Sequence, residues 1–139
     1  MDIQSIFDAF ELLESWDERF DLIADLGREL LPISDEERGD NNLVPGCDTR
    51  TWLVGHLSDE NPPVITFHAD AEGPLVRGLV ALLLMPYRGM TPEEVLAFDP
   101  GPYVRKLGLE QALSMKRRAG MMAFFTRLKQ IAAAAQARD

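Results

Sequence analysis

The sequence is poor in cysteine: Cys47 is the single one among 139 residues. One thiol cannot form an intrachain disulfide, and it cannot supply the cysteines of a zinc ribbon or a CxxC redox pair. Together with the only two histidines, His56 and His68, it is also too small a ligand set for an ordinary iron–sulfur cluster. Any cysteine chemistry of this chain is therefore single-thiol chemistry, completed by a partner molecule.

Long apolar runs are also missing. The longest covers residues 79–86, far short of the roughly 20 residues that a membrane-spanning helix needs. The first residues lack the basic-then-apolar layout of a signal peptide. We therefore expect a cytoplasmic protein without membrane contact. The sequence contains no glycine-rich phosphate loop and no dinucleotide fingerprint, and it predicts no bound cofactor or metal.

Basic residues are few, with 14 Lys and Arg against 23 Asp and Glu and a net charge of −9. Since nucleic-acid affinity comes largely from Lys and Arg contacts to phosphate, this balance argues against a nucleic-acid partner. The charge is unevenly distributed: residues 1–102 carry 6 basic and 21 acidic residues, whereas residues 103–139 carry 8 and 2. Faces of opposite sign could orient a protein partner, and an ordinary solvated surface would give the same pattern.

What the sequence does contain is an ordinary globular composition, with 46% hydrophobic residues. This length and composition suffice for one core, so we predict a single domain over residues 1–139. Apolar spacing and proline positions predict helices near residues 3–13, 15–30, 74–85 and 114–137, with residues 75–85 as the buried central helix. A further helix would start at Thr91, and residues 99–107 would form a short segment before Gly108. Strand formers predict an antiparallel hairpin over 51–57 and 64–68, whose third strand stays unassigned. The fold class that follows is α+β, with helices packed on a small antiparallel sheet.

Three segments have the pattern of a capping box, in which a Ser or Thr and a Glu three residues later satisfy each other's free backbone donors. The first two would start the helix over 15–30 and a short helical turn after Ser34. The third would start a helix with proline at its first position. The pairs are Ser15 with Glu18, Ser34 with Glu37, and Thr91 with Glu94.

Cys47 follows Gly46, between a loop-like segment and the first predicted strand. A thiol reacts as the thiolate and must be reachable, and a neighbouring glycine leaves its approach open and its backbone adaptable. This placement suits a cysteine on a loop that enters a partner's active site. Free cysteines are also commonly buried as small hydrophobes. From these residues alone, a reactive and a structural Cys47 both remain open.

The histidines and the acidic residues before the central helix are weaker candidates. His56 and His68 fall on opposite strands of the predicted hairpin, without a carboxylate at ligand spacing, so we expect surface or hydrogen-bonded residues. Asp70 and Glu72 precede the central helix, where carboxylates complement the helix dipole.

Many short segments follow one another in an order that goes beyond these general patterns. They lie at residues 10–13, 16–20, 26–32, 42–47, 52–54, 76–79, 87, 89–94, 98–100, 107–109, 113–114, 117 and 120–121. In this order they resemble the SufE family of sulfur acceptors, and the resemblance covers almost the whole chain.

The resemblance implies an α+β fold like that of SufE and the IscU-type scaffolds. It also implies that Cys47 accepts a persulfide from a SufS- or CsdA-like cysteine desulfurase. The chain would stimulate that enzyme and pass the sulfur to a cluster-assembly scaffold. The chain would then be an accessory protein rather than an enzyme. Gly46, Trp52, Asp70 and Arg117 would belong to the active loop and its shell. The alternative is an adapter that binds the desulfurase while Cys47 is structural.

Asp48 follows the cysteine where the family usually has glutamine. A carboxylate at this position should disfavour the Cys47 thiolate by like-charge repulsion unless Arg50 or another cation offsets it.

Overall fold

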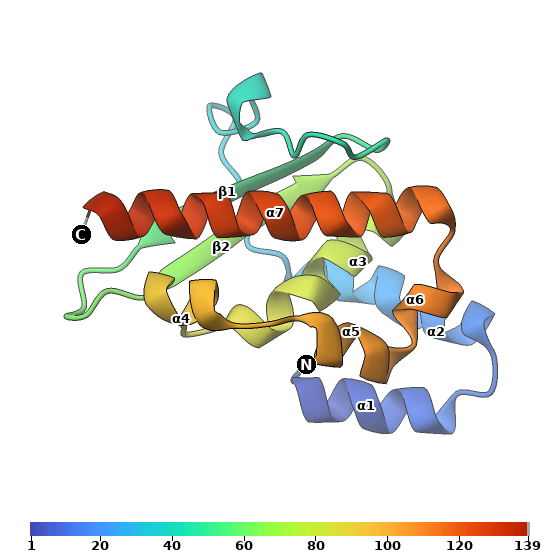
Figure 1. Cartoon of the computed structure of the whole chain (residues 1–139). Coiled ribbons are helices and arrows are strands. Elements are labelled where there is room, and N and C mark those ends of the chain that lie inside the picture. Colours follow the sequence, from blue (N-terminus) through green and yellow to red (C-terminus); the bar gives the residue numbers. More distant parts are fainter. Residues whose placement is uncertain (139) are drawn as a thin grey trace.

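The computed structural model describes residues 1–138, in which helices surround one short hairpin (Figure 1). The strands are β1 (Thr51–Leu57) and β2 (Ile65–Ala71). The helices are α1 (Ile3–Leu12), α2 (Trp16–Leu26), α3 (Pro74–Leu84), α4 (Pro92–Ala97), α5 (Gly101–Leu107), α6 (Leu109–Ala112) and α7 (Met115–Arg138). Within this part of the chain, no helix is long and apolar enough to cross a membrane.

The sheet consists of β1 and β2, paired antiparallel from Thr51 opposite Ala71 to Leu57 opposite Ile65. The α+β expectation is therefore confirmed, with helices packed on a small antiparallel sheet. Within residues 1–138 no third strand joins this sheet, and only an isolated bridge between Leu43 and Trp52 extends the pairing.

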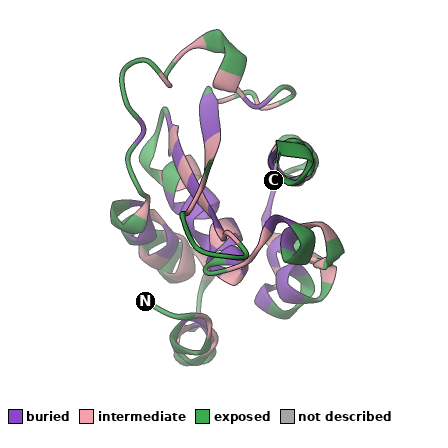
Figure 2. Cartoon of the chain, turned by 90° about the vertical axis from the view of Figure 1, so that its left-hand side faces the viewer, coloured by how far each residue is buried: buried purple, intermediate pink, exposed green. Residues whose placement is uncertain are grey.

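Strand alternation separates two faces of the hairpin. The inner face carries Leu53, Ile65, Phe67 and Ala69, all buried. Helix α3 packs against β2 and α7 packs against β1 on this side, and α7 crosses in front of both strands in Figure 1. Buried residues accordingly gather on the strands and on the inward sides of the helices (Figure 2).

Helix α3 is the buried central helix that its nearly continuous apolar sequence predicts, because its residues from Gly78 to Leu83 are all buried. The long helix α7 buries an apolar stripe against the same core. The buried members are Met121, Phe124, Phe125 and Leu128, and Ile131 is partly buried against the cluster.

The capping patterns are confirmed to different degrees. The box at Thr91 and Glu94 is complete at the start of α4. Ser15 caps α2 by accepting the Glu18 N–H at 3.2 Å, but the Glu18 carboxylate accepts the Ser15 hydroxyl rather than its N–H.

Ser34 and Glu37 also bond reciprocally, at 2.9 and 3.1 Å, and the Arg38 N–H donates to the Ser34 carbonyl oxygen at 3.1 Å, so this box starts a single helical turn that goes no further.

Two details of the helices differ from the sequence prediction. Helix α2 ends at Leu26 and continues as a 3₁₀ turn over Gly27–Glu29, so the helical segment ends close to the predicted Leu30 but its last turn is 3₁₀. Beyond it the backbone is extended at Leu30, and the Leu31 carbonyl accepts the Ala69 N–H at 3.2 Å. Helix α6 was not predicted because four residues are too few to show a period; left-handed Gly108 separates it from α5.

Helices α2 and α3 meet at a point where only glycine fits. A Cβ atom added at Gly78 would overlap the carbonyl oxygen of Ile23, and one added at Gly27 would lie 3.2 Å from the Cβ of Arg77. The absence of a side chain at Gly78 thus lets the backbones of the two helices touch and positions α2 against the core.

We predict that Gly78→Ala lowers the free energy of unfolding by about 1–3 kcal/mol or more, because α2 must move away from α3. Helix propensity alone would favour alanine by about 0.5–1 kcal/mol, so the sign of the change decides between the two effects. Urea unfolding measures it. Gly39→Ala is the control, since a Cβ there meets only the Glu36 carbonyl, at 3.6 Å. Equal stability of both variants would contradict this account.

Candidate functional site

The loop before β1 carries Cys47 close to α7. Gly46 has a φ angle of +88°, in the left-handed region that favours glycine. A Cβ atom at this position would also lie 3.3 Å from the Cβ of Ala123, which is a tight contact. Gly46 therefore serves both the turn of the loop and its close approach to the helix.

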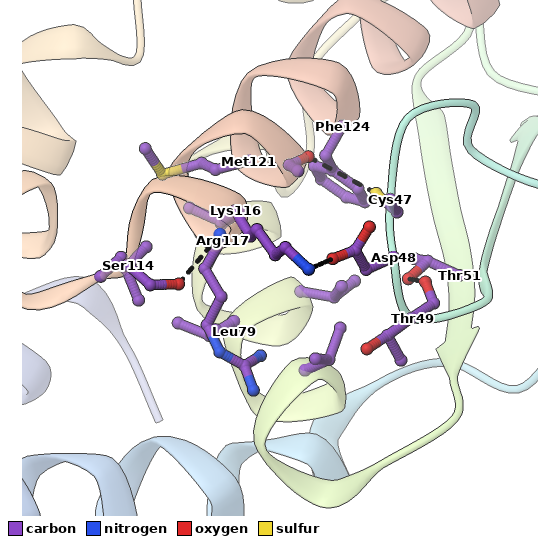
Figure 3. A pocket seen from close by; sticks show the side chains of 15 residues that line it. Cys47, Asp48, Thr49, Thr51, Leu79, Ser114, Lys116, Arg117, Met121 and Phe124 are labelled. Carbon is purple, nitrogen blue, oxygen red and sulfur yellow. Dashed lines mark hydrogen bonds and ion pairs between the residues drawn. The ribbon is translucent and has the colours of Figure 1, made fainter.

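The thiol of Cys47 lies half-buried against the backbone of α7. Its Sγ donates a weak hydrogen bond to the Gly120 carbonyl oxygen at 3.5 Å, as drawn in Figure 3. Because Gly120 has no side chain, the sulfur approaches the helix directly; a Cβ there would already touch Sγ at 3.7 Å.

Next to the thiol is a pocket of about 310 Å³ between the loop, α3 and α7 (Figure 3). Cys47, Asp48, Thr49 and Thr51 form the loop side. The other walls are largely apolar, with charged residues from the first turn of α7 at the rim. They comprise Val76, Leu79, Val80, Leu83, Leu113, Ser114, Lys116, Arg117, Gly120, Met121 and Phe124.

The charges around the loop are paired in a way that the sequence did not indicate. The Asp48 carboxylate lies 3.5 Å from the Lys116 ammonium of α7, and both side chains are exposed. Arg50 instead lies 3.7 Å from Asp40 and 3.5 Å from Glu72. The cation that faces Asp48 is therefore Lys116 and not Arg50.

Burial raises the pKa of the Cys47 thiol, because the thiolate loses hydration in this pocket. The Thr51 side chain lowers this pKa through a hydrogen bond, and the Asp48 carboxylate raises it by like-charge repulsion. The expectation that Asp48 disfavours the thiolate is thus confirmed in direction, although burial has the larger effect. At neutral pH the resting group is the neutral thiol.

Trp52 and Asp70 lie behind the loop, on the outer face of the hairpin, as direct cross-strand partners. Trp52 is buried, and the guanidinium carbons of Arg38 and Arg50 lie 4.9 and 5.3 Å from its ring centre. Such cation–π contacts hold the first residues of β1 in place.

Asp70 collects three donors: Arg38 at 2.7 Å, Arg77 at 3.1 Å and the N–H of Ala71 at 2.8 Å. It lies inside β2, so its interpretation as a helix-start carboxylate was wrong. The structure brings Cys47 and Arg117 to the pocket and places Gly46 beside it against Ala123 of α7, whereas Trp52 and Asp70 lie on the sheet behind it.

His56 and His68 also lie on the outer face, as hydrogen-bonded residues. The Nε2 atom of His56 lies 2.7 Å from Glu37 Oε2, and the Nδ1 atom of His68 lies 2.9 Å from the Pro32 carbonyl oxygen. Neither histidine lines the pocket of Cys47. Over the described part of the chain, no group of three or more His, Cys, Asp or Glu side chains is arranged to hold a metal ion.

We predict that the alkylation rate of Cys47 rises with pH and that the pH of half-maximal rate, the midpoint, is higher for the folded chain than for the urea-unfolded chain. The thiol of the unfolded chain should have a pKa of about 8.5. The reason is that burial raises the pKa of the folded thiol, so below the midpoint the neutral, unreactive form dominates. Asp48→Asn should lower the midpoint because it removes the repelling carboxylate. A folded midpoint at or below that of the unfolded chain would contradict the described burial.

Comparisons of the sequence and of the fold relate this chain to known proteins. The family model for SufE, described as an Fe–S metabolism associated domain, matches residues 4–132. An uncharacterized SufE-like protein of Rhizobium etli is 34% identical over 129 residues, which cover 92% of this chain and 87% of that protein. An uncharacterized SufE-like protein of Rhizobium meliloti is 32% identical over 128 residues, which cover 91% of each chain.

A solved structure shares the fold. The solution structure of a hypothetical protein from Thermus thermophilus superposes with a TM-score of 0.75, covering 97% of this chain and 96% of its own, at 20% sequence identity. The family match spans nearly all of the chain, includes the Cys47 loop and all three walls of the pocket, and agrees with the two relatives. The chain therefore belongs to the SufE family and has a role in Fe–S metabolism.

Proposed function

We propose that this protein is a sulfur carrier. Cys47 accepts sulfur as a persulfide from a cysteine desulfurase of the SufS or CsdA kind, the protein stimulates that enzyme, and the sulfur passes on to a cluster-assembly scaffold. The observation that carries the proposal is the placement of the single cysteine on a glycine-preceded loop, with its thiol at an apolar pocket. Family membership supports the setting in Fe–S metabolism.

The transfer is a thiol–persulfide exchange without net oxidation. The Cys47 thiolate attacks the outer sulfur of the partner's cysteine persulfide, a new S–S bond forms, and the old S–S bond breaks. The partner's cysteine leaves as a thiolate, and the proton of the Cys47 thiol goes to a base of the partner or to water. A second exchange of the same kind, with a scaffold thiol as nucleophile, removes the outer sulfur from Cys47.

The lack of a second cysteine suits this role. A neighbouring thiol would attack the Cys47 persulfide, form a disulfide and release the sulfur, but Cys47 is the only cysteine of the chain. The resting thiol is partly desolvated and neutral, so it is protected from other oxidants and electrophiles. To react, the loop must leave α7, and the partner's active site must favour the thiolate.

The shell residues support the loop without taking part in the exchange. Gly46 provides the left-handed turn, Trp52 and Asp70 anchor the start of the hairpin, and Arg117 contributes a cation at the pocket rim. In this proposal residues 1–139 act as one SufE-like sulfur-acceptor domain, and no resident cofactor takes part. The chemistry that extracts sulfur from free cysteine belongs to the desulfurase, and this chain is its accessory protein.

We predict that incubation with a cysteine desulfurase and free cysteine adds the mass of one sulfur atom to the intact chain. Mass spectrometry should find the addition on Cys47, and a reductant should remove it. Cys47→Ser should bind the desulfurase equally well and gain no sulfur. An unchanged mass of the wild-type chain, with binding demonstrated in the same sample, would contradict the carrier function.

Desulfurase activity, measured with and without this protein, separates the carrier from an adapter. If Cys47 is structural, Cys47→Ala should still bind and stimulate the desulfurase, whereas the carrier hypothesis expects stimulation to be lost.

We further predict that Asp70→Asn lowers the free energy of unfolding by about 1–2 kcal/mol, because Arg38 and Arg77 lose their shared, partly exposed carboxylate. Folded Asp70→Asn should still accept sulfur on Cys47, since Asp70 lies behind the pocket. Asp59→Asn is the matched control, an exposed residue without an ion pair among residues 1–138. A fully stable Asp70→Asn that fails to accept sulfur would contradict the supporting role.

A further inference from the structure

Two polar contacts connect the loop of Cys47 to the first turns of α7. One is the weak hydrogen bond from the thiol to the Gly120 carbonyl oxygen, and the other is the ion pair between Asp48 and Lys116 (Figure 3). Lys116 and Gly120 are four residues apart and therefore lie one above the other on the same side of the helix. Cys47 and Asp48 are adjacent in the loop, so the two contacts form a pair across the pocket.

We propose that Asp48 and Lys116 are positioning residues, which hold the Cys47 loop in its docked position until a partner displaces it. Both side chains lie at the rim of the pocket, where a docking protein meets them first. Their side chains are 69% and 85% exposed, so water and salt weaken the pair. The inference rests on the proposed function, because a docked loop matters only if Cys47 must leave it to react.

A weak contact is what such a loop requires. An exposed ion pair changes an equilibrium by about two- to fivefold, which biases the loop toward α7 without locking it. The sulfur-mediated bond to Gly120 is also weak, as S–H is a poor donor. A partner that offers its own carboxylate to Lys116 would therefore release Asp48 and the loop together.

The pair could instead act only through space, by tuning the thiol. The two accounts predict opposite effects of removing Lys116. Loss of a nearby cation would raise the pKa of Cys47 and slow its reaction at neutral pH. Loss of the positioning contact would undock the loop and speed the same reaction. Asp48→Asn cannot separate them, because both accounts predict a faster reaction for that variant.

The test is the rate of Cys47 alkylation by iodoacetamide, an uncharged reagent, at pH 7.5 and low salt. Lys116→Gln should react about two- to fivefold faster than the wild type, in line with the energy of an exposed pair. Lys116→Arg should keep the slow rate because it preserves the charge. Arg118→Gln is the control for a lost cation, because Arg118 is exposed and makes no ion pair among residues 1–138; its rate should stay unchanged or fall.

Charge reversal makes the test specific to this pair. Lys116→Asp should alkylate faster than the wild type, because two carboxylates then face each other and the loop undocks, whereas the through-space account predicts a slower reaction for this variant. Raising the salt to about 1 M, where the Debye length is about 3 Å, should bring the wild type toward Lys116→Gln. An unchanged or slower rate for Lys116→Gln would overturn the proposal, as would a Lys116→Asp variant that reacts no faster than the wild type.

These results are independent of sulfur transfer, because alkylation requires no desulfurase. If Lys116→Gln alkylates slowly but the wild-type chain still gains sulfur on Cys47, only the positioning role fails. If the chain gains no sulfur but Lys116→Gln alkylates faster, the pair still positions the loop and the carrier function fails.

Discussion

The close approach of α7 to β1 and to the Cys47 loop is the constraint on which the site depends. It occurs at three glycines. A Cβ at Gly55 of β1 would lie 2.7 Å from Ile131, one at Gly46 would lie 3.3 Å from Ala123, and Gly120 itself faces the Cys47 sulfur. The α7 residues at these contacts, 120, 123 and 131, lie within an arc of about 80° around the helix, because each residue advances it by about 100°. A side chain at Gly55 would push α7 outward, one at Gly46 would crowd Ala123, and a Cβ at Gly120 would make only ordinary contact with the sulfur.

This packing determines the chemical state of the thiol. Held against the helix backbone, Cys47 loses part of its hydration and its pKa rises. The polar contacts that hold it there, beside its packing against the core, are a weak hydrogen bond and an exposed ion pair. Trp52 and Asp70 anchor the following strand through buried and partly buried contacts. The strand that follows the thiol is thus firmly anchored, and that arrangement suits the proposed transfer, in which Cys47 reaches out to a partner.

Much of this architecture follows from local sequence patterns. Periodicity placed α1, α3 and α7, and the β-branched run after Cys47 placed the hairpin, because these elements bury one continuous face. The extended segment after α2 and the location of Asp70 involve contacts with distant segments, at Leu31 with Ala69 and at Arg77. The roles of Arg38 and Lys116 could not be predicted for the same reason: their partners lie 32 and 68 positions away in the sequence. Sequence indicated Cys47 and Gly46, while the pocket walls required the fold.

The central claim is that sulfur resides on Cys47 between two proteins. A desulfurase can be loaded with radioactive sulfur as its persulfide, freed from cysteine, and mixed with this chain for a single turnover. The account predicts that the label leaves the desulfurase and appears on the wild-type chain but not on Cys47→Ser, as read from a non-reducing gel. Label that stays on the desulfurase while the two proteins form a complex would contradict it.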